Sequence, residues 1–366
     1  MNISCILVHY HTPELLKRAV SAIRSDVSSS SGLEAEIIVV DNGSRGEDAR
    51  LLKNLPVKLI APGRNLGYAG GVNLGVKHSH SDVFIFMNPD VEVLPGCIGG
   101  LVKALKDGAS AAGPRFYFDH GKEIIIPPLM WLTRMNELIW RSSVLSHGQA
   151  KRVRNHWRKH AKAHWLARAP VLNYNLMGAL LAVSRSAWEK IGPFDEVFQL
   201  YYEEADWLKR LKNNNLKAYY VPASEAVHHY SQSASKEPKA RGWFHESAHI
   251  FRRRHYGSVF TAFLERGIPA LRRLTGFKEV VSLTTNPPGR PLIDLSGVGG
   301  VNSYPIWIEI SMNALGIPAL GVPINSDEIR KWEFPLPDWE ALEPGAYYFT
   351  TVDNDGSELS RSIFIR

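Results

Sequence analysis

Acidic and histidine residues stand at the ends of apolar segments in this chain, where their side chains could bind a metal ion or move a proton. The apolar residues 84–87 end abruptly in the turn Asn88-Pro89-Asp90, which carries one carboxylate. At the carboxyl end of a strand such a carboxylate can contact a divalent cation, because hard cations prefer oxygen ligands. An isolated Asn-Pro-Asp turn is more often only a solvated turn, so the interpretation depends on the segments around it.

Two further apolar segments place polar residues at the same kind of position. Residues 3–8 lead into His9, and residues 37–40 lead into Asp41. Helical patterns separate the apolar segments, at residues 14–25, 71–78 and 97–106. This alternation predicts βαβ units, an α/β fold and a mostly parallel sheet. Because the carboxyl ends of parallel strands meet at one edge, we expect these polar residues to share one crevice.

Six short motifs, in their order and spacing, resemble those of the inverting family 2 glycosyltransferases, in the branch that contains rhamnosyltransferases and galactofuranosyltransferases. The resemblance covers roughly residues 3–260 and implies the GT-A fold of nucleotide-diphospho-sugar transferases. In the first motif the chain departs from the Asn-Tyr-Asn pattern usual in the family. The motifs are Val8-His9-Tyr10, Val40-Asp41-Asn42-Gly43-Ser44, the glycine-rich run from Arg64 to Asn73, Asn88-Pro89-Asp90, Gly192-Pro193-Phe194-Asp195-Glu196 and Tyr202-Glu203-Glu204-Ala205-Asp206.

The resemblance implies a site for a nucleoside-diphosphate sugar. It assigns Asp41 to the nucleotide base and places Asn88 beside the ribose or the diphosphate. The glycines of residues 67–71 permit close backbone approach, and the start of the next helix favours anions. A glycine-rich turn alone more often only turns the chain, and Asp41 before Asn42-Gly43 also suits a turn. The predicted donor contacts are His9, Tyr10, Asp41, Asn42, Arg64, Asn65, Gly67, Tyr68, Gly71, Asn73, Asn88 and Asp90.

The resemblance also implies two protein ligands for a divalent metal. Asp90 is the first, and His228, which follows a predicted strand at residues 217–221, is the second. Mn²⁺ or Mg²⁺ bound there would stabilise the charge that develops on the departing diphosphate, and a nitrogen ligand favours Mn²⁺. The alternative is that His228 is a strand-end histidine with one local hydrogen bond.

An inverting transfer needs a base that takes the proton of the acceptor hydroxyl. The acidic motif of the family maps onto Glu203, Glu204 and Asp206, and its second acid, Glu204, is the predicted base. We expect Glu203 and Asp206 to orient neighbours, since Asp206 and Arg210 have the i, i+4 spacing of a helical salt bridge. Acids that open a helix also serve simply to complement its dipole.

The region before the acidic motif resembles the acceptor-facing loop of the family. It implies acceptor contacts from Gly178, Trp188, Phe194 and Asp195. Aromatic rings commonly stack on sugar faces, although each of these rings equally suits a core position, which the helical position of Trp188 favours.

Composition shifts along the chain predict its organisation. We expect a GT-A catalytic domain over residues 1–235, with a basic, aromatic, partly helical insertion at about residues 122–169. A helical segment over residues 236–280 follows, and residues 281–366 read as a small β-rich accessory domain because short alternating runs replace the helical patterns.

The charge balance favours an anionic partner. The formal net charge is +7 and the isoelectric point is about 9.3. The insertion and residues 240–276 combine Arg and Lys with aromatic residues, a pattern that suits the anionic surface of a membrane. The second stretch equally suits a helix packed on the core. No apolar run reaches the roughly 18 residues that span a bilayer. The two cysteines, Cys5 and Cys97, suggest neither a disulfide framework nor a zinc cluster, and a reducing cytoplasm fits best.

These features together predict a metal-dependent, inverting glycosyltransferase of the hexosyltransferase class. By resemblance, it transfers rhamnose from dTDP, or another sugar from dTDP or UDP, to a glycan or lipid-linked glycan in cell-surface polysaccharide synthesis. We expect it at the inner face of the cell membrane or free in the cytoplasm, with no nucleic-acid partner and with oligomerisation left open. The alternatives are a nucleotidyltransferase that forms sugar nucleotides, for which the chain lacks a triphosphate signature, and a basic nucleic-acid-binding protein.

Overall fold

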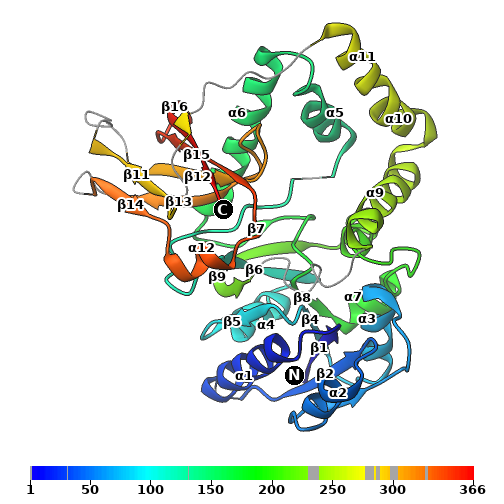
Figure 1. Cartoon of the computed structure of the whole chain (residues 1–366). Coiled ribbons are helices and arrows are strands. Elements are labelled where there is room, and N and C mark those ends of the chain that lie inside the picture. The colour runs from blue at the N-terminus through cyan, green and yellow to red at the C-terminus, as the bar shows by residue number, and fades with distance from the viewer. Residues whose placement is uncertain are drawn as a thin grey trace. The chain divides into compact units, whose positions relative to one another are not determined.

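The computed structural model describes residues 2–30, 32–130, 132–229, 239–276, 284–285, 289–296, 304–325 and 329–366 (Figure 1). The chain divides into two compact units. Unit 1 comprises Met1–Phe116 and Ala167–Thr261, and unit 2 comprises Tyr117–Leu166 and Ala262–Arg366. This division differs from the predicted boundaries. Most of the insertion at residues 122–169 groups with the C-terminal residues, and the predicted helical segment at residues 236–280 is divided between the units.

Unit 1 is built on a nine-stranded sheet in the order β3-β2-β1-β4-β8-β6-β9-β5, with β7 paired to β9. Strands β3, β2, β1 and β4 run parallel, and β8 joins β4 in the antiparallel direction. The predicted α/β fold with a parallel sheet is confirmed in these four strands, and the remaining strands extend it. The strands are β1 (Ile3–His9), β2 (Ala35–Asp41), β3 (Lys58–Ile60), β4 (Val83–Met87), β5 (Val91–Val93), β6 (Ala111–Tyr117), β7 (Val171–Leu172), β8 (Leu180–Ser184) and β9 (Ala218–His228).

Helices cover both faces of the parallel strands. One face of β1, with Ile6 and Val8, packs against α3 at its glycines: a Cβ atom on Gly71 would lie 2.7 Å from Val8 Cγ1, so the helix can approach this closely only without a side chain there. The core on this face also contains the large side chains of α7 and α8. The helices of unit 1 are α1 (Pro13–Ser29), α2 (Gly46–Lys53), α3 (Gly67–Lys77), α4 (Cys97–Lys106), α7 (Arg185–Ile191), α8 (Glu203–Asn213), α9 (Ala240–Tyr256) and most of α10 (Ser258–Ala262).

Unit 2 combines helices with small sheets. A five-stranded sheet has the order β10-β16-β15-β12-β13, and β11 pairs with β14. The C-terminal residues, whose composition is typical of strands, therefore do form strands. The strands are β10 (Thr284–Thr285), β11 (Leu292–Asp294), β12 (Ile306–Ser311), β13 (Leu320–Ile324), β14 (Lys331–Glu333), β15 (Ala346–Val352) and β16 (Glu358–Ile365). The helices are α5 (Arg134–Ser142), α6 (His147–Trp165), the π-helical segment η2 (Phe263–Gly267), α11 (Ile268–Thr275) and α12 (Leu336–Ala341).

Helix α6 belongs to unit 2 because its basic and aromatic residues bind the five-stranded sheet. The buried guanidinium of Arg158 donates to both carboxylate oxygens of Glu309 at 2.8–2.9 Å. Lys162 donates to the backbone oxygens of Asp353 and Asn354, and the ring of Trp165 stacks on Trp307. The expectation that this whole stretch faces an anionic partner is corrected for these residues, whose charges and rings are used within the protein.

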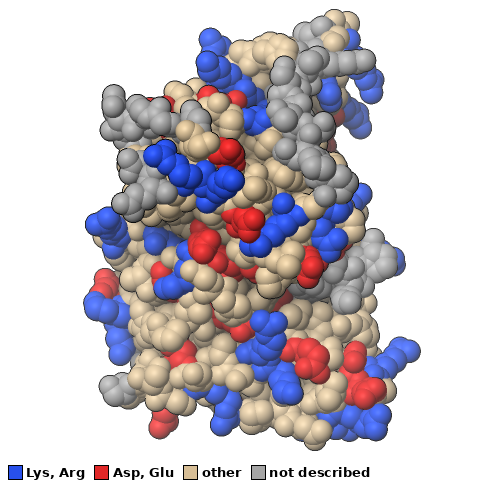
Figure 2. Space-filling view, turned by 60° about the vertical axis from the view of Figure 1, so that its left-hand side comes forward, with Lys and Arg blue, Asp and Glu red and all other residues tan. Residues whose placement is uncertain are grey.

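The remaining surface charge is mixed. On the face that Figure 2 shows, Lys and Arg side chains are interspersed with Asp and Glu and do not form one continuous basic field. A nucleic-acid backbone attracts a basic patch or stripe, so this face gives no support to the nucleic-acid-binding alternative. Among the described residues, no helix is long and apolar enough to cross a membrane.

Candidate active site

The β5–β9 ladder brings Asp90 and His228 together. Val91 pairs with His228 in the antiparallel direction, and the His229 N–H donates to the Asp90 backbone oxygen at 2.9 Å. Asp90 Oδ1 and His228 Nε2 are consequently 3.6 Å apart, and both residues are buried. The two predicted metal ligands therefore lie side by side at the end of the sheet. A carboxylate oxygen and an imidazole nitrogen in this arrangement suit a divalent cation such as Mn²⁺.

Asn88 forms the turn that presents Asp90. Its N–H donates to the Ala179 oxygen at 2.8 Å, and its own backbone oxygen accepts from Val91 N–H at 3.2 Å. The turn is thus held by β8 on one side and β5 on the other, which fixes the direction in which Asp90 leaves the sheet.

Asp41 ends β2 beside the end of β1. The parallel register places His9 next to Asp41, and His9 Nδ1 lies 3.3 Å from Asp41 Oδ1. Ser44 N–H donates to the same oxygen at 3.0 Å. Burial alone would raise the pKa of Asp41, but the hydrogen bonds from His9 and Ser44 outweigh it and lower the pKa. Asp41 is therefore an ionised acceptor, as the predicted contact with a ring N–H requires.

The expected partners of His9 are the nucleotide or the neighbouring loops, and the structure shows the loop contacts. Its ring is fully buried, and its Nε2 accepts from the Thr12 N–H at 3.0 Å. Because protein atoms surround the ring, we correct the predicted direct contact with nucleotide: the His9 side chain positions Asp41. Tyr10, the next residue, is half-buried and its ring lies edge-on to His11.

The glycine-rich segment is anchored to the end of β2 by Asn42. The Asn42 side chain donates to Gly67 O at 2.9 Å and accepts from Leu66 N–H at 3.3 Å. Gly67 has a φ of +72°, and Asn65 Oδ1 accepts from its N–H at 2.8 Å. Arg64 and Asn65 are exposed, so their side chains are available to a ligand over this edge.

Two predicted donor contacts in the same segment serve packing instead. Gly71 allows α3 to lie against Val8, as described above. The buried Asn73 side chain donates to Phe194 O and to Glu196 Oε1 at 2.9 Å, and it accepts from Phe194 N–H at 3.0 Å. Asn73 therefore holds the loop after α7, because its amide is committed to that loop on both sides.

Glu203 and Glu204 open α8 after a strained turn. Tyr201 and Tyr202 both have positive φ, 67° and 71°, which is costly for residues with large side chains. A Cβ atom on Gly178 would lie 2.9 Å from Glu204 Cγ, so glycine is needed there for this side chain to fit. Among the described residues, the buried Oε2 atoms of both glutamates have no hydrogen-bond partner.

The two glutamates perturb each other. Burial, followed by the nearby Glu204 charge, raises the pKa of Glu203 well above 4.5. Burial also raises the pKa of Glu204, but hydrogen bonds from the backbone, including that of Gly178, oppose the rise. Glu203 therefore holds a proton more firmly, which leaves Glu204 as the carboxylate that can accept one.

Tyr68 connects this pair to Asp90. Its hydroxyl donates to Gly178 O at 3.2 Å. Its pKa is raised by burial and by the negative charges of Glu203, Glu204 and Asp90. Gly178 also lies against Glu204, and the next residue, Ala179, accepts from the Asn88 N–H in the turn that presents Asp90, so these groups belong to one site.

Asp206 has a different environment from the two glutamates. The predicted i, i+4 salt bridge is confirmed, since Arg210 Nε lies 2.9 Å from Asp206 Oδ2. Burial would raise the pKa of Asp206, but hydrogen bonds from His255, Arg210 and Arg254 lower it to about 2. The sequence did not identify Arg254 and His255, because their partner lies far away along the chain and they stand within a basic run typical of a surface.

The predicted acceptor residues separate into two groups. The rings of Trp188 and Phe194 are buried in the core, and Trp188 stacks on Trp207 with ring centroids 5.9 Å apart. Of the two alternatives for these rings, the core position is the one observed, and the predicted acceptor contact is corrected for both. Gly178 stands beside Glu204, and Asp195 lies on the loop after α7, where it pairs with Arg254.

The fold is mixed α/β, with one large sheet covered by helices and additional small sheets. Residues 4–161 match the family model described as glycosyl transferase family 2. The chain is similar to the N-acetylglucosaminyl-diphospho-decaprenol L-rhamnosyltransferase of Mycobacterium tuberculosis, at 29% identity over 68% of this chain and 85% of that protein. It is also similar to the low-salt glycan biosynthesis hexosyltransferase Agl10 of Haloferax volcanii, at 26% identity over 62% of this chain and 67% of that protein. The family model and these relatives support a glycosyltransferase of family 2.

Among solved structures, the mannosyltransferase PcManGT of Pyrobaculum calidifontis, in complex with GDP-Man and Mn²⁺, aligns with a TM-score of 0.48. The sequence identity is 12%, and the alignment covers 75% of this chain and 72% of that one.

Proposed function

We propose that this protein is an inverting, metal-dependent glycosyltransferase that moves a sugar from a nucleoside diphosphate to the hydroxyl of a glycan. The observation that carries the proposal is that a pair of potential metal ligands and a buried pair of carboxylates lie in one site. Asp90 and His228 lie 3.6 Å apart, and Glu204 packs against Gly178, whose neighbour Ala179 accepts from the Asn88 N–H in the turn before Asp90.

The donor set fits a divalent metal. Asp90 and His228 would hold it, with the diphosphate oxygens of the donor as further ligands. When bound, Mn²⁺ or Mg²⁺ would supply the positive charge that stabilises the leaving diphosphate. Asp41, ionised and held by His9 and Ser44, would accept a hydrogen bond from the nucleotide base.

Glu204 is the proposed base. The acceptor oxygen forms a bond to the anomeric carbon while the bond from that carbon to the diphosphate oxygen breaks, and the hydroxyl proton passes to the Glu204 carboxylate. Attack from the face opposite the leaving group inverts the anomeric configuration. Glu203, which holds its proton more firmly, limits the negative charge next to Glu204 and orients its carboxylate.

We infer rhamnose as the sugar from the name of the mycobacterial relative. The family resemblance favours dTDP as its carrier, with a UDP sugar as the next candidate. The mycobacterial relative is named for a rhamnosyl transfer to a diphospho-decaprenol-linked sugar, which suggests a lipid-linked acceptor here as well. Unit 2 offers a surface that suits this. Phe263, Leu271 and Leu274 are exposed near the basic Arg266 and Arg273, a combination that binds anionic membrane surfaces.

Nucleotide binding and turnover test the proposal. Purified protein would be titrated with dTDP-, UDP- and GDP-sugars, with Mn²⁺, with Mg²⁺ and with chelator, and nucleotide release would be followed. We expect binding of one nucleotide class that needs metal and is weakened at least about 100-fold in Asp90→Ala. Asp107→Ala, which removes an exposed carboxylate just after the end of α4, is the matched control and should bind as the wild type does. Binding that is unaffected by chelator, or absent for every sugar nucleotide, would contradict the proposal.

A further inference from the structure

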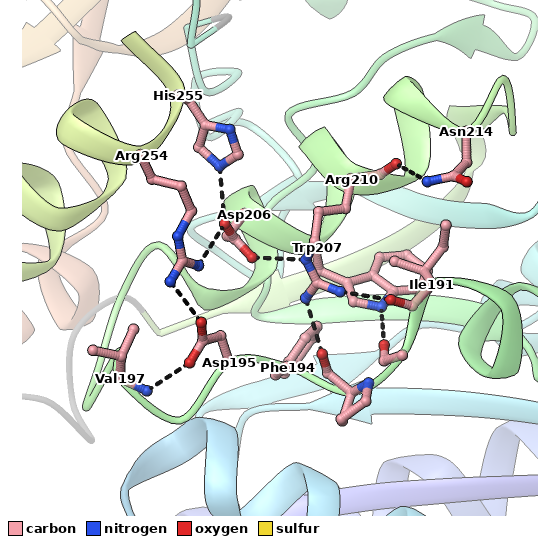
Figure 3. A network of polar contacts seen from close by, with 12 residues as sticks. Ile191, Phe194, Asp195, Val197, Asp206, Trp207, Arg210, Asn214, Arg254 and His255 are labelled. Atoms are coloured by element: carbon pink, nitrogen blue, oxygen red, sulfur yellow. Dashed lines mark hydrogen bonds and ion pairs between the residues drawn. The ribbon is translucent and has the colours of Figure 1, made fainter. Parts of the chain in front are cut away.

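The C-terminal end of α9 contacts the buried carboxylate of Asp206 (Figure 3). Arg254 Nη1 lies 3.0 Å and His255 Nε2 lies 2.9 Å from Asp206 Oδ1, while Arg210 of α8 occupies Oδ2. Both carboxylate oxygens are thus bound by donors, two of which come from a helix far along the chain. Asp206 lies on the turn of α8 that carries Glu203 and Glu204.

The same hydrogen bonds and ion pairs also hold the loop after α7. Arg254 Nη2 lies 2.7 Å from Asp195 Oδ2, so one guanidinium bridges that loop and α8. Arg210 donates to Ile191 O at 2.8 Å and to Pro193 O at 2.9 Å. Residues 191–195 are therefore fixed to α8 and α9 by two arginines.

Helix α9 also contacts the strained turn that precedes the acidic pair. Ser247 Oγ donates to Leu200 O at 3.0 Å, and the buried ring of Phe251 lies 5.4 Å from the ring of Tyr202. The contacts of α9 thus begin before Glu203 and end after Glu204. A strained turn persists only where its surroundings determine it, and α9 supplies those surroundings.

We propose that Arg254 and His255 are positioning residues of the transfer reaction. Through Asp206 and Asp195 they hold the first turn of α8 and the loop after α7 in one arrangement, which sets the direction of the Glu204 carboxylate. This inference rests on the proposed function for its kinetic part. Catalysis tolerates little displacement of a base, because a shift of about 1 Å costs up to about 100-fold in rate.

A purely structural role for Arg254 predicts that its loss lowers the melting temperature together with kcat. A positioning role predicts a fall in kcat with little change in the melting temperature. The ion pair of Arg254 with Asp195 joins side chains that are 37% and 38% exposed and contributes little to stability, and the buried Asp206 keeps Arg210 and His255 as partners when Arg254 is lost. Loss of this guanidinium should therefore lower kcat far more than it lowers the melting temperature. The adjacent Arg253 is a matched control, since it is exposed on the same helix turn and has no ion pair among the described residues.

The test compares Arg254→Met, Arg254→Lys and Arg253→Met in the full chain. For Arg254→Met we expect kcat to fall about 10- to 100-fold, with the Kd for donor and metal within about twofold of wild type. Arg254→Lys should recover part of the rate, because lysine keeps the charge but reaches Asp195 and Asp206 less well together. Arg253→Met should match the wild type in both quantities.

Hydrogen exchange gives a second readout that needs no turnover. In Arg254→Met, amides of the peptide covering residues 200–208 should exchange faster, while those of β1 should not change. If wild-type protein binds and turns over no sugar nucleotide, the proposed function fails, and this exchange result alone decides the positioning role. Unchanged exchange in residues 200–208 would overturn the inference, as would equal falls in kcat for the Arg254→Met and Arg253→Met variants.

Discussion

The first turn of α8 contains two opposite environments for a buried carboxylate. Asp206 is bound by Arg210, Arg254 and His255, and its pKa is lowered to about 2. Glu203 and Glu204, three and two residues earlier, are buried without a cationic partner among the described residues, and their pKa values are raised. Burial acts in the same direction on all three, so the difference comes from their partners.

This difference assigns separate tasks to neighbouring acids. A fully paired carboxylate such as Asp206 has a pKa too low to accept a substrate proton at neutral pH, and its hydrogen bonds fix α8 in place. A carboxylate that is buried and unpaired destabilises the folded protein, and it is retained where reactivity is needed. Substitutions that remove the charge of one acid at a time test whether the two environments have these different effects.

The largest expected effect comes from Glu204→Gln, which removes the base without changing the size of the side chain. We expect kcat to fall by about 10²- to 10⁴-fold, the usual contribution of a general base, with the donor Kd unchanged. Steady-state kinetics and nucleotide titration measure the two quantities. The exposed Glu189→Gln is the control and should behave as the wild type. A larger fall in Glu203→Gln than in Glu204→Gln would reverse their assigned roles.

Asp206→Asn should give the next largest effect, and it concerns stability. Removing this charge leaves Arg210, Arg254 and His255 around a neutral amide, and breaking a buried ion pair in this way costs about 3–5 kcal/mol in the free energy of unfolding. Urea denaturation at neutral pH measures the loss. Asp107→Asn on the surface should change the free energy by less than about 0.5 kcal/mol.

The same substitution should change the acid limb of the stability curve. The folded pKa of Asp206, about 2, lies below the ordinary value of 3.8. Its contribution is therefore fully present above about pH 4 and is lost as the pH falls toward 2. Urea midpoints between pH 4 and 2 should fall less steeply in Asp206→Asn than in the wild type. Parallel curves would mean that Asp206 is not strongly paired.

The sequence predicted the parts of the fold that depend on local pattern. Apolar segments that end in polar residues located β1, β2 and β4, and with them Asp41 and Asp90, because both the strand and its end are visible within a few residues. The grouping of residues 122–166 with the C-terminal residues was not predicted, since it depends on pairs such as Arg158 with Glu309 that no local pattern reveals.

The site shows the same limit. The acidic motif indicated Glu203, Glu204 and Asp206 but not their different environments, because these depend on Arg254 and His255 from another helix. For Trp188 and Phe194 the sequence left two positions open, one facing an acceptor and one in the core. An aromatic residue next to an acidic motif has the same sequence signature whether its ring stacks on a sugar or fills the core.

The smallest expected effect concerns the pH dependence of Glu203. Its folded pKa lies well above the ordinary 4.5, so its contribution to stability is present below pH 4.5 and is lost as the pH rises through the folded pKa. Glu203→Gln has no proton to lose. The melting temperature of Glu203→Gln, relative to that of the wild type, should therefore increase as the pH rises from 4.5 to 8. The increase should be about 2–4 °C for each ~1 kcal/mol of destabilisation by the ionised Glu203 that the substitution removes.

Melting curves at several pH values measure this gain, with Glu189→Gln as the control that should follow the wild type throughout. The sign is opposite to that of Asp206→Asn, which loses stability at neutral pH and recovers it relative to the wild type only in acid. Two acids three residues apart should thus give difference curves of opposite slope. If both curves slope the same way, burial alone sets both acids, and the partners in α8 and α9 do not separate their tasks.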